Sequence, residues 1–461
     1  FNRVSLMNVL EPQRELSIDV FPLDGVDPAR MKHKENGNHA DNLFYQMRQD
    51  GDNKWLFICH VDKPRNEAIA WNERWDIKIK GEYQAVCYDT MDGKIYPVKA
   101  AIKDGNTIIH HIASLHDSLL LKLLAIENSK KADSVNAVDN VVKEEVFKIP
   151  QNQKNLPEPF QYRLEEHNSL LLDMAQYAFD EEEWQEREEL LRIDNLFREK
   201  LHYPLRMEAL AQPWTEKDEQ KSEHVLKLRF HIYSEVEMNE VELAMEHPET
   251  AEICWNGEAL EYIDSGFYVD ESIRTCKLKK LQKGENTLFV KIPFGRKTNV
   301  EWMYLLGEFG VKTIGKYGII TNLPARLCYG DITTQNLAFY GGSLEYKNKV
   351  STEAGIMNLE VSHYKGALLE VFLDGENKGS LFMAPYRKNL GKVEKGEHEI
   401  TIKVYGNRSN TFGVVHNADR TESWYGPNLW RTTGNKWSYE YQLEQMGVLA
   451  TPVYWIEEGT D

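Results

Sequence analysis

The sequence predicts an all-β chain of three β-sandwich domains with one short helical segment near residues 183–202. Two observations carry this prediction. Short apolar runs recur along the chain between turns that contain glycine, asparagine or aspartate, which is the pattern of antiparallel strands. Clear helical periodicity is confined to one stretch, and strands without helices between them indicate sandwiches instead of a parallel sheet.

The first predicted sandwich occupies residues 1–124. Two β-prone runs in 42–61 are joined by an Asp-Gly pair at 50–51, which favours a two-residue hairpin turn. A second Asp-Gly pair at 92–93 joins the next two runs in the same way. The polar stretch that follows is unpatterned and becomes rich in asparagine and proline, so we predict a linker over 125–160.

The helix is predicted inside the next domain, 161–335. Its apolar stripe follows steps of three and four residues and comprises Leu190, Ile193, Phe197 and Leu201. Acidic residues crowd the positions before the stripe, where the helix dipole favours them, and Asp180 with Glu183 fits a capping box. We therefore place the helix near 183–202, ended by Pro204, with its charged face toward solvent.

One arrangement is written twice in the rest of the chain. A strand ends in an Asn-Gly turn at 256–257 or an Asp-Gly turn at 374–375. A Gly-Glu turn then opens a long alternating strand, at 284–285 and again at 396–397. Two copies are too few for a solenoid. The repeat therefore predicts two related sandwich units, the second over 336–461.

Composition argues against some classes of partner. The chain has 73 acidic and 55 basic residues and a formal net charge of −18, whereas nucleic-acid binding depends on clustered lysine and arginine. No apolar run approaches the roughly 18–20 residues that a membrane-spanning helix needs. We therefore expect neither nucleic acid nor a membrane as a partner, and sugars remain open.

The five cysteines are widely spaced and include no C-x-x-C pair. We interpret them as small buried hydrophobes in a reducing, cytoplasmic compartment, with a disulfide between Cys254 and Cys276 as the alternative. The chain begins at Phe1 without a basic-then-apolar leader, which we interpret as a truncated start. His111 and His116 lack ligand spacing, so we expect structural roles for them.

The second copy of the repeat carries the residues of a known motif. Within 366–417 an Asp-Gly turn is followed by a glycine, a Pro-Tyr segment, a Gly-Glu turn and an asparagine after the last strand. These places are held by Asp374, Gly375, Gly379, Pro385, Tyr386, Gly396, Glu397 and Asn407. The segment resembles the galactose-binding-like jelly-roll domain of family 2 glycoside hydrolases. The longer run over 267–347 is similar to the C-terminal part of large bacterial glycoside hydrolases of the α-L-rhamnosidase-like kind. Taken together, the resemblance covers about 41–455 and is strongest over 224–417.

The resemblance implies a non-catalytic region of a carbohydrate-degrading enzyme. In such enzymes the sandwiches follow a (β/α)8 catalytic barrel, and this sequence lacks the strand–helix alternation of a barrel. We therefore expect the chain to brace an upstream catalytic domain of the same polypeptide and to hold no catalytic residue. The alternatives are a freestanding carbohydrate-binding module and a chain that is itself a glycosidase. Jelly rolls of this kind often hold Ca²⁺, which no loop of the sequence places.

The aromatic stretch 421–442 is the candidate glycan-binding site. Aromatic faces pack on the apolar side of pyranose rings, and polar groups fix the hydroxyls. Two glycines and a proline give the stretch loop character. The predicted contacts with an oligosaccharide are Trp424, Tyr425, Trp430 and Trp437, with Asn428, Arg431 and Asn435 beside them. The alternative is that these tryptophans fill the interface between sandwiches.

Overall fold

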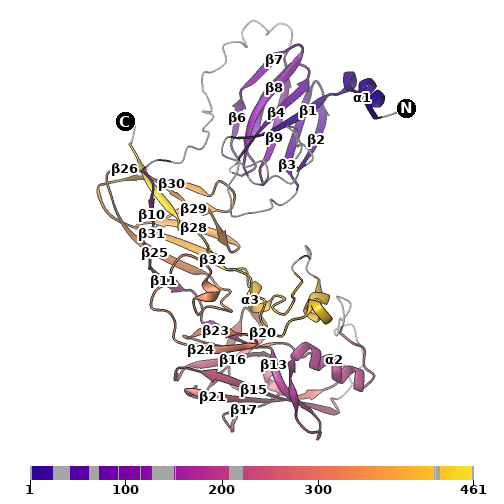
Figure 1. Ribbon diagram of the computed structural model, residues 1–461, viewed down its shortest axis with the longest axis vertical. Helices are drawn as coiled ribbons and strands as arrows, with labels where there is room; N and C mark the ends of the chain where they lie inside the picture. Colours follow the sequence, from indigo (N-terminus) through magenta and orange to yellow (C-terminus); the bar gives the residue numbers. More distant parts are fainter. Residues whose placement is uncertain are drawn as a thin grey trace.

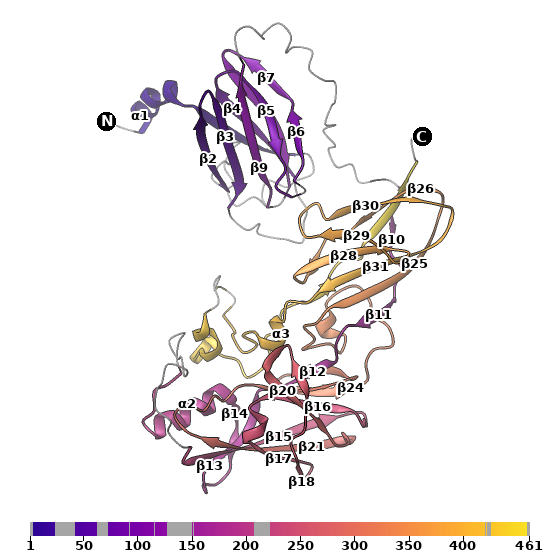
Figure 2. The same ribbon diagram turned by 180° about the vertical axis from the view of Figure 1, so that it is seen from behind.

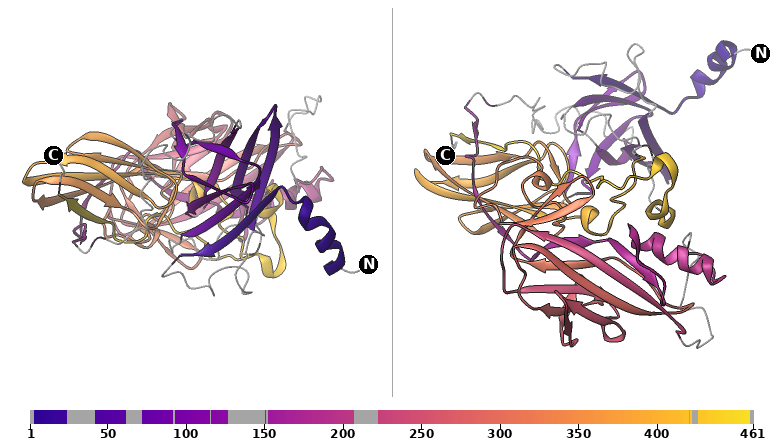
Figure 3. Two further views of the ribbon diagram at one scale, coloured as in Figure 1. Left: turned by 90° about the horizontal axis from the view of Figure 1, so that it is seen from above. Right: turned by 60° about the horizontal axis from the view of Figure 1, so that its bottom comes forward.

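The protein is an array of antiparallel sheets, drawn in Figures 1 to 3 from a computed structural model. The structure describes residues 3–23, 42–61, 72–91, 93–114, 116–126, 150, 152–206, 222–419, 421 and 426–458. The predicted all-β fold is confirmed, because the described strands pair almost entirely antiparallel and enclose three hydrophobic cores. No helix among these residues is long and apolar enough to cross a membrane.

The N-terminal unit is a two-sheet sandwich preceded by helix α1 (Arg3–Leu10). Its strands pair in the orders β2-β3-β9-β5-β6 and β1-β4-β8-β7. The strands are β1 Leu16–Pro22, β2 Leu43–Asp50, β3 Asn53–His60, β4 Glu73–Lys80, β5 Tyr83–Tyr88, β6 Ile95–Val98, β7 Ala100–Lys103, β8 Asn106–Ala113 and β9 Ser118–Ala125. Burial alternates along β3 and β4, so every second side chain enters the core between the sheets.

The two predicted hairpins of this unit form. Asp50 ends β2 and lies opposite Asn53, so the turn residues are Gly51 and Asp52, one position later than predicted. Gly51 has φ +60°, a backbone conformation that glycine adopts without strain. Strands β5 and β6 pair across the second turn, although residue 92 itself lies outside the described residues.

The middle unit packs a five-stranded sheet, β12-β22-β16-β20-β19, against an eight-stranded one that contains the path β14-β13-β15-β21-β17-β18 together with β23 and β24. Its strands are β12 Asn168–Leu172, β13 Met174–Phe179, β14 Gln185–Glu189, β15 His224–Ser234, β16 Val241–Glu246, β17 Glu252–Trp255, β18 Glu258–Leu260, β19 Asp264–Tyr268, β20 Asp270–Leu278, β21 Gly284–Phe294, β22 Met303–Gly307, β23 Gly310–Ile314 and β24 Tyr317–Thr321.

The C-terminal unit packs the sheet β11-β25-β31-β28-β29 against the sheet β10-β33-β26-β30. Its strands are β10 Lys154–Asn155, β11 Gln161–Leu164, β25 Leu344–Thr352, β26 Gly355–Glu360, β27 Tyr364–Lys365, β28 Leu368–Leu373, β29 Glu376–Leu381, β30 Arg387–Val393, β31 Gly396–Tyr405, β32 Gly447–Val448 and β33 Val453–Glu457. The pair β27-β32 stands apart from both sheets.

The middle and C-terminal units repeat one strand arrangement. The path β15-β21-β17-β18 of the first corresponds to β25-β31-β28-β29 of the second, and β22-β16-β20 corresponds to β33-β26-β30. The repeated turns fall at matching places: Asn256 and Gly257 join β17 to β18, whereas Asp374 and Gly375 join β28 to β29. All four residues have positive φ, which is the geometry of a tight hairpin turn.

The middle unit is inserted into the C-terminal unit. Strands β10 and β11 precede the middle unit in sequence, yet they pair with β33 and β25, which follow it. The two-residue strand β10 falls in the predicted linker 125–160, of which residues 127–149 lie outside the described residues. The domain boundaries at 161–335 and 336–461 stay predictions. The pairings show in addition that the chain leaves the C-terminal sandwich after β11 and returns to it at β25.

The predicted helix is confirmed, but its predicted start is wrong. Helix α2 spans Leu190–Lys200 and buries three residues of the predicted stripe, whereas Leu201 is its C-cap and is partly buried. The expectation that the charged face is solvated is wrong for Asp194 and Arg198, which are buried as a pair. The acidic residues before it form strand β14, because they continue the sheet by pairing with β13. Glu189 is the N-cap, whereas Asp180 accepts a hydrogen bond from Val225 N (2.8 Å) at the turn after β13. The start of α2 is therefore set by the pairing of β14 with β13, which outweighs the local helix signals in the sequence.

The cysteines are free thiols, and the alternative disulfide is wrong. Cys254 lies on β17 between two buried residues, so the alternation of the strand turns its side chain away from the core. Cys276 lies on β20 in the opposite sheet and points into the core. The two side chains therefore do not face each other.

Replacing Ile402 by alanine should destabilise the C-terminal unit. Ile402 is fully buried in the middle of β31, so the loss of three methyl-sized groups leaves a cavity. We expect the free energy of unfolding to fall by about 2–5 kcal/mol in urea titrations followed by circular dichroism. Thr401→Ala, on the outward side of the same strand, is the control; equal losses in both variants would contradict this placement of the core.

Candidate functional site

The candidate aromatic segment leaves the C-terminal unit and packs on the middle unit. After β31 and helix α3 (Ser409–Phe412) the chain runs to the 3₁₀ turns η9 (Pro427–Arg431) and η10 (Gly434–Lys436), beside helix α2 in all views (Figures 1 to 3). Val415 belongs to the core of the middle unit, and Tyr441 packs against that core. We call the described part of residues 413–442 the strap, because this segment runs from the C-terminal unit across the middle unit.

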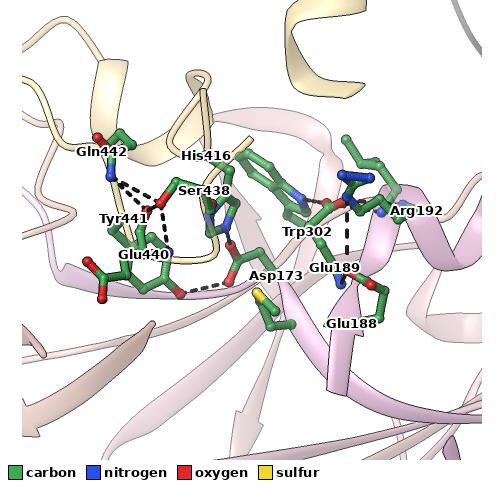
Figure 4. Close-up of polar contacts among 12 residues, drawn as sticks. Asp173, Glu188, Glu189, Arg192, Trp302, His416, Ser438, Glu440, Tyr441 and Gln442 are labelled. Atoms are coloured by element: carbon green, nitrogen blue, oxygen red, sulfur yellow. Dashed lines mark hydrogen bonds and ion pairs between the residues drawn. The ribbon is translucent and has the colours of Figure 1, made fainter. Parts of the chain in front are cut away.

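A buried ion pair fastens this strap (Figure 4). His416 on the strap lies 2.6 Å (Nε2 to Oδ2) from Asp173, which separates β12 from β13, and both side chains are buried. Tyr441 Oη donates to the other oxygen of Asp173 (2.8 Å). His416 Nδ1 donates to the carbonyl of Ser438 (2.8 Å), because a carbonyl oxygen only accepts. When the ring is protonated, Nε2 donates to Asp173 as well and the contact is an ion pair. Burial, the largest single influence, lowers the pKa of His416, but the hydrogen bond to Asp173, the charges of Asp173 and Glu189 and the bond to Ser438 O together outweigh it, so the net pKa is raised.

Glu189 lies beside this pair and is fully occupied by the protein (Figure 4). Its Oε1 accepts from Trp302 Nε1 (2.6 Å) and Leu191 N (3.0 Å), and its Oε2 accepts from Arg192 N (3.1 Å). Burial raises the pKa of Glu189 to about 7, against these hydrogen bonds, which lower it. A raised carboxyl pKa is often a mark of an acid catalyst, but here the geometry is that of a helix N-cap.

A second charged cluster joins the other face of α2 to the strap. Arg198 Nε lies 2.9 and 3.0 Å from the two oxygens of the buried Asp194, and Arg206 Nε lies 3.5 Å from one of them. Arg431, on the strap, is close enough to lower the pKa of both Asp194 and Glu301. Burial outweighs these charges at Glu301 and raises its pKa to about 7.

The polar residues predicted to bind sugar lie at the surface of the strap. Asn428 and Asn435 are exposed, and neither sits on a regular strand or α-helix. Arg431 is partly buried, and its Nε has no hydrogen-bond acceptor among the described residues. Trp424 and Tyr425 lie outside the described residues.

The two described tryptophans are partly buried against protein groups. Trp430 Nε1 donates to Phe412 O (3.1 Å). The Arg192 guanidinium lies 4.0 Å from the centre of a Trp437 ring, and the His416 ring lies 4.8 Å from it at a tilt of 35°. Trp437 Nε1 is buried and has no acceptor among the described residues. Protein groups therefore contact both of these tryptophans, and the Trp437 ring is covered by Arg192.

Sequence reasoning missed the groups that fasten the strap. Asp173 and His416 are 243 residues apart, so no spacing motif links them. One signal was available: Asp173 interrupts an apolar run of buried strand residues, where a lone carboxylate needs a partner. The partner itself is set by the tertiary fold.

The described residues hold no group of three or more His, Cys, Asp and Glu side chains placed to bind a metal ion. His111 instead pairs with Asp117 (Nε2 to Oδ2, 3.0 Å) within the N-terminal unit.

No protein-family model matches the sequence, and no curated protein matches it. Among solved structures, a rhamnosidase from Novosphingobium sp. PP1Y matches 98% of this chain at 11% identity with a TM-score of 0.38. An α-L-rhamnosidase from Streptomyces avermitilis matches 89% at 10% identity (TM-score 0.24), and a GH2 β-galacturonidase from Eisenbergiella tayi matches 54% at 9% (TM-score 0.20). This chain covers 26, 39 and 37% of those three chains. At these values the matches assign no family.

Replacing Glu301 by glutamine should change how stability depends on pH. A carboxyl whose pKa is raised in the folded state binds its proton more tightly there, so the free energy of unfolding falls as pH rises from about 4.5 to about 7. Glu301→Gln should raise that free energy by roughly 1–2 kcal/mol at pH 8 and leave it nearly unchanged at pH 4.5. Urea titrations at both pH values test this, with the exposed Glu249→Gln as control. An equal effect at both pH values would contradict the raised pKa.

Replacing His416 by alanine should loosen the strap. The change leaves Asp173 buried without its counter-ion, which costs roughly 3–5 kcal/mol. Tyr441→Phe removes one hydrogen bond to the same carboxylate and should cost about 1 kcal/mol. Urea titration gives the loss, and hydrogen exchange of the strap shows where it falls. A His416→Ala variant within 1 kcal/mol of the wild type would rule out the ion pair as the fastening.

Proposed function

We propose that this chain is an accessory, non-catalytic portion of a carbohydrate-degrading glycoside hydrolase. It braces a catalytic domain of the same polypeptide and contacts glycan through the strap. The observation that carries the glycan contact is the strap itself: a loop fixed to the middle unit by a buried ion pair, with exposed amides and with N–H donors that have no acceptor among the described residues. Binding residues held on loops by a rigid scaffold are the usual arrangement in binding proteins.

The motif residues of the second repeat support the bracing role. The Asp374 carboxylate accepts from Glu399 N (2.8 Å) and lies 2.7 Å from His398 Nδ1, which joins the β28–β29 turn to β31. Asn407 Oδ1 accepts from Ser409 N (3.0 Å) at the point where the chain leaves β31 for the strap. In these positions the motif holds the jelly roll together and directs the strap toward the middle unit.

The state of the buried carboxyls supports the non-catalytic reading. Glycoside hydrolysis needs a general acid and a second carboxylate that both reach the glycosidic bond. Glu189 has a pKa of about 7, suited to a general acid, yet it is fully buried and its two oxygens accept three hydrogen bonds from the chain. It therefore has no oxygen directed at a substrate.

The purified chain should bind oligosaccharides without cleaving them. Asn428 and Asn435 are exposed amides suited to sugar hydroxyls, so the double variant Asn428→Ala/Asn435→Ala should weaken binding about tenfold in calorimetry, the loss of one or two hydrogen bonds. Asn322→Ala, another exposed asparagine, is the control.

Aryl glycosides should show no turnover with the same preparation. Turnover that survives purification would establish the glycosidase alternative, and absence of binding across a broad glycan panel would leave bracing as the remaining role.

A further inference from the structure

We propose that the strap and α2 form a site for the carboxylate of an acidic sugar, such as a uronic acid within a glycan. The inference rests on the proposed function and names the ligand class of that site. The site would be formed by a group of buried N–H donors, which we call the donor cluster: Arg192, Arg206, Arg431 and Trp437.

The donor cluster lacks hydrogen-bond acceptors. The Nε atoms of its three arginines and Nε1 of Trp437 are buried and have no hydrogen-bond acceptor among the described residues. Buried polar groups are nearly always paired in folded proteins, and each unpaired donor costs about 1–3 kcal/mol. The Nε atom of Arg296, the amide oxygens of Asn168 and Asn348 and the hydroxyl of Thr352 are in the same condition elsewhere in the chain. The four donors of the cluster are grouped because they lie on the strap, on α2 or just after α2.

The chemistry of the donors selects an anion. Three of the four belong to guanidinium groups, which carry a permanent positive charge and offer no acceptor. A planar carboxylate can take two N–H groups of one guanidinium at once, and such bonds are about twice as strong as neutral ones. A neutral hydroxyl oxygen would satisfy one donor at a time, whereas a carboxylate offers two oxygens and a charge opposite to that of the guanidinium groups.

The carboxylates near the cluster already have partners. Asp194 receives both of its short contacts from Arg198, and Arg206 is left at 3.5 Å from it. Glu188 accepts from Tyr439 Oη (2.9 Å) and lies 4.0 Å from Arg192 Nε. Arg431 is close enough to Glu301 for its charge to lower the pKa of that carboxyl, although burial raises the pKa overall.

The cluster is continuous with the exposed amides. Arg192 Nη2 donates to Thr432 O (3.2 Å), next to Arg431, while the same guanidinium covers Trp437. Asn428 and Asn435 lie on the two 3₁₀ turns of the strap and are exposed. A sugar ring at these amides would place its carboxylate toward the arginines and its hydroxyls toward the amides.

Calorimetry on the full chain with a matched ligand pair tests this inference. The ligands are an oligogalacturonide and the same oligosaccharide after reduction of its carboxyl groups to alcohols. We expect the acidic form to bind at least about tenfold more tightly, the scale of one charge-assisted hydrogen bond. Arg431→Gln should abolish that preference and change the affinity for the reduced form less than about twofold. Arg326→Gln, an exposed arginine outside the strap, is the control.

Two further arms separate the outcomes. Trp437→Phe keeps an aromatic ring but removes the N–H together with the pyrrole part of the indole, so it should weaken binding of the acidic ligand by a few-fold if the fold is intact by circular dichroism. Inorganic phosphate should not compete at equal concentration; full competition would mean an anion site without sugar selectivity and would overturn the inference. Equal binding of both oligosaccharides overturns the acidic preference alone, whereas binding of neither also removes glycan contact from the proposed function.

Discussion

The buried contact between His416 and Asp173 is the constraint on which the arrangement of the two C-terminal sandwiches depends. A carboxylate with no exposure to solvent at the end of β12 is unfavourable without a partner, and the partner comes from a loop 243 residues later. The contact between Asp173 and His416 holds the strap on the middle unit. Tyr441 and Trp437 then pack beside the pair, so one electrostatic requirement fixes the course of a segment that has little regular structure of its own.

The same strap closes a topology in which one sandwich is nested in another. The chain enters the C-terminal unit through β10 and β11, leaves to build the middle unit, and returns at β25. The middle unit is thus joined to its host at both ends, and the strap adds a third connection across it. Arg408 on the strap side of β31 also pairs with Glu166, between β11 and β12 (Nη2 to Oε2, 2.6 Å). The middle and C-terminal units are therefore connected at several places along the chain.

The carboxyls of this junction show how a catalytic signature can have a structural origin. Glu189 and Glu301 both have pKa values raised to about 7, mainly by burial. A perturbed pKa marks a functional site only when the group can reach a ligand. The oxygens of Glu189 accept hydrogen bonds from the first turn of α2 and from Trp302. The nearby arginines, in contrast, have buried Nε atoms without a hydrogen-bond acceptor among the described residues. The chemistry that remains open at this place is recognition by N–H groups.

The sequence by itself determined the strands, the tight turns and the duplication, because alternation and Asn-Gly or Asp-Gly pairs act within a few residues. It also identified Arg431 and Trp437 as candidate site residues from local composition, but as part of a stacking surface. Only the tertiary structure decided the start of α2, where pairing of β14 overrode helix signals, and the nesting of the units, since β11 meets β25 across 180 residues or so of chain. It also decided which residues contact the strap. These charged groups come together only after the chain has folded, so no spacing in the sequence identifies them.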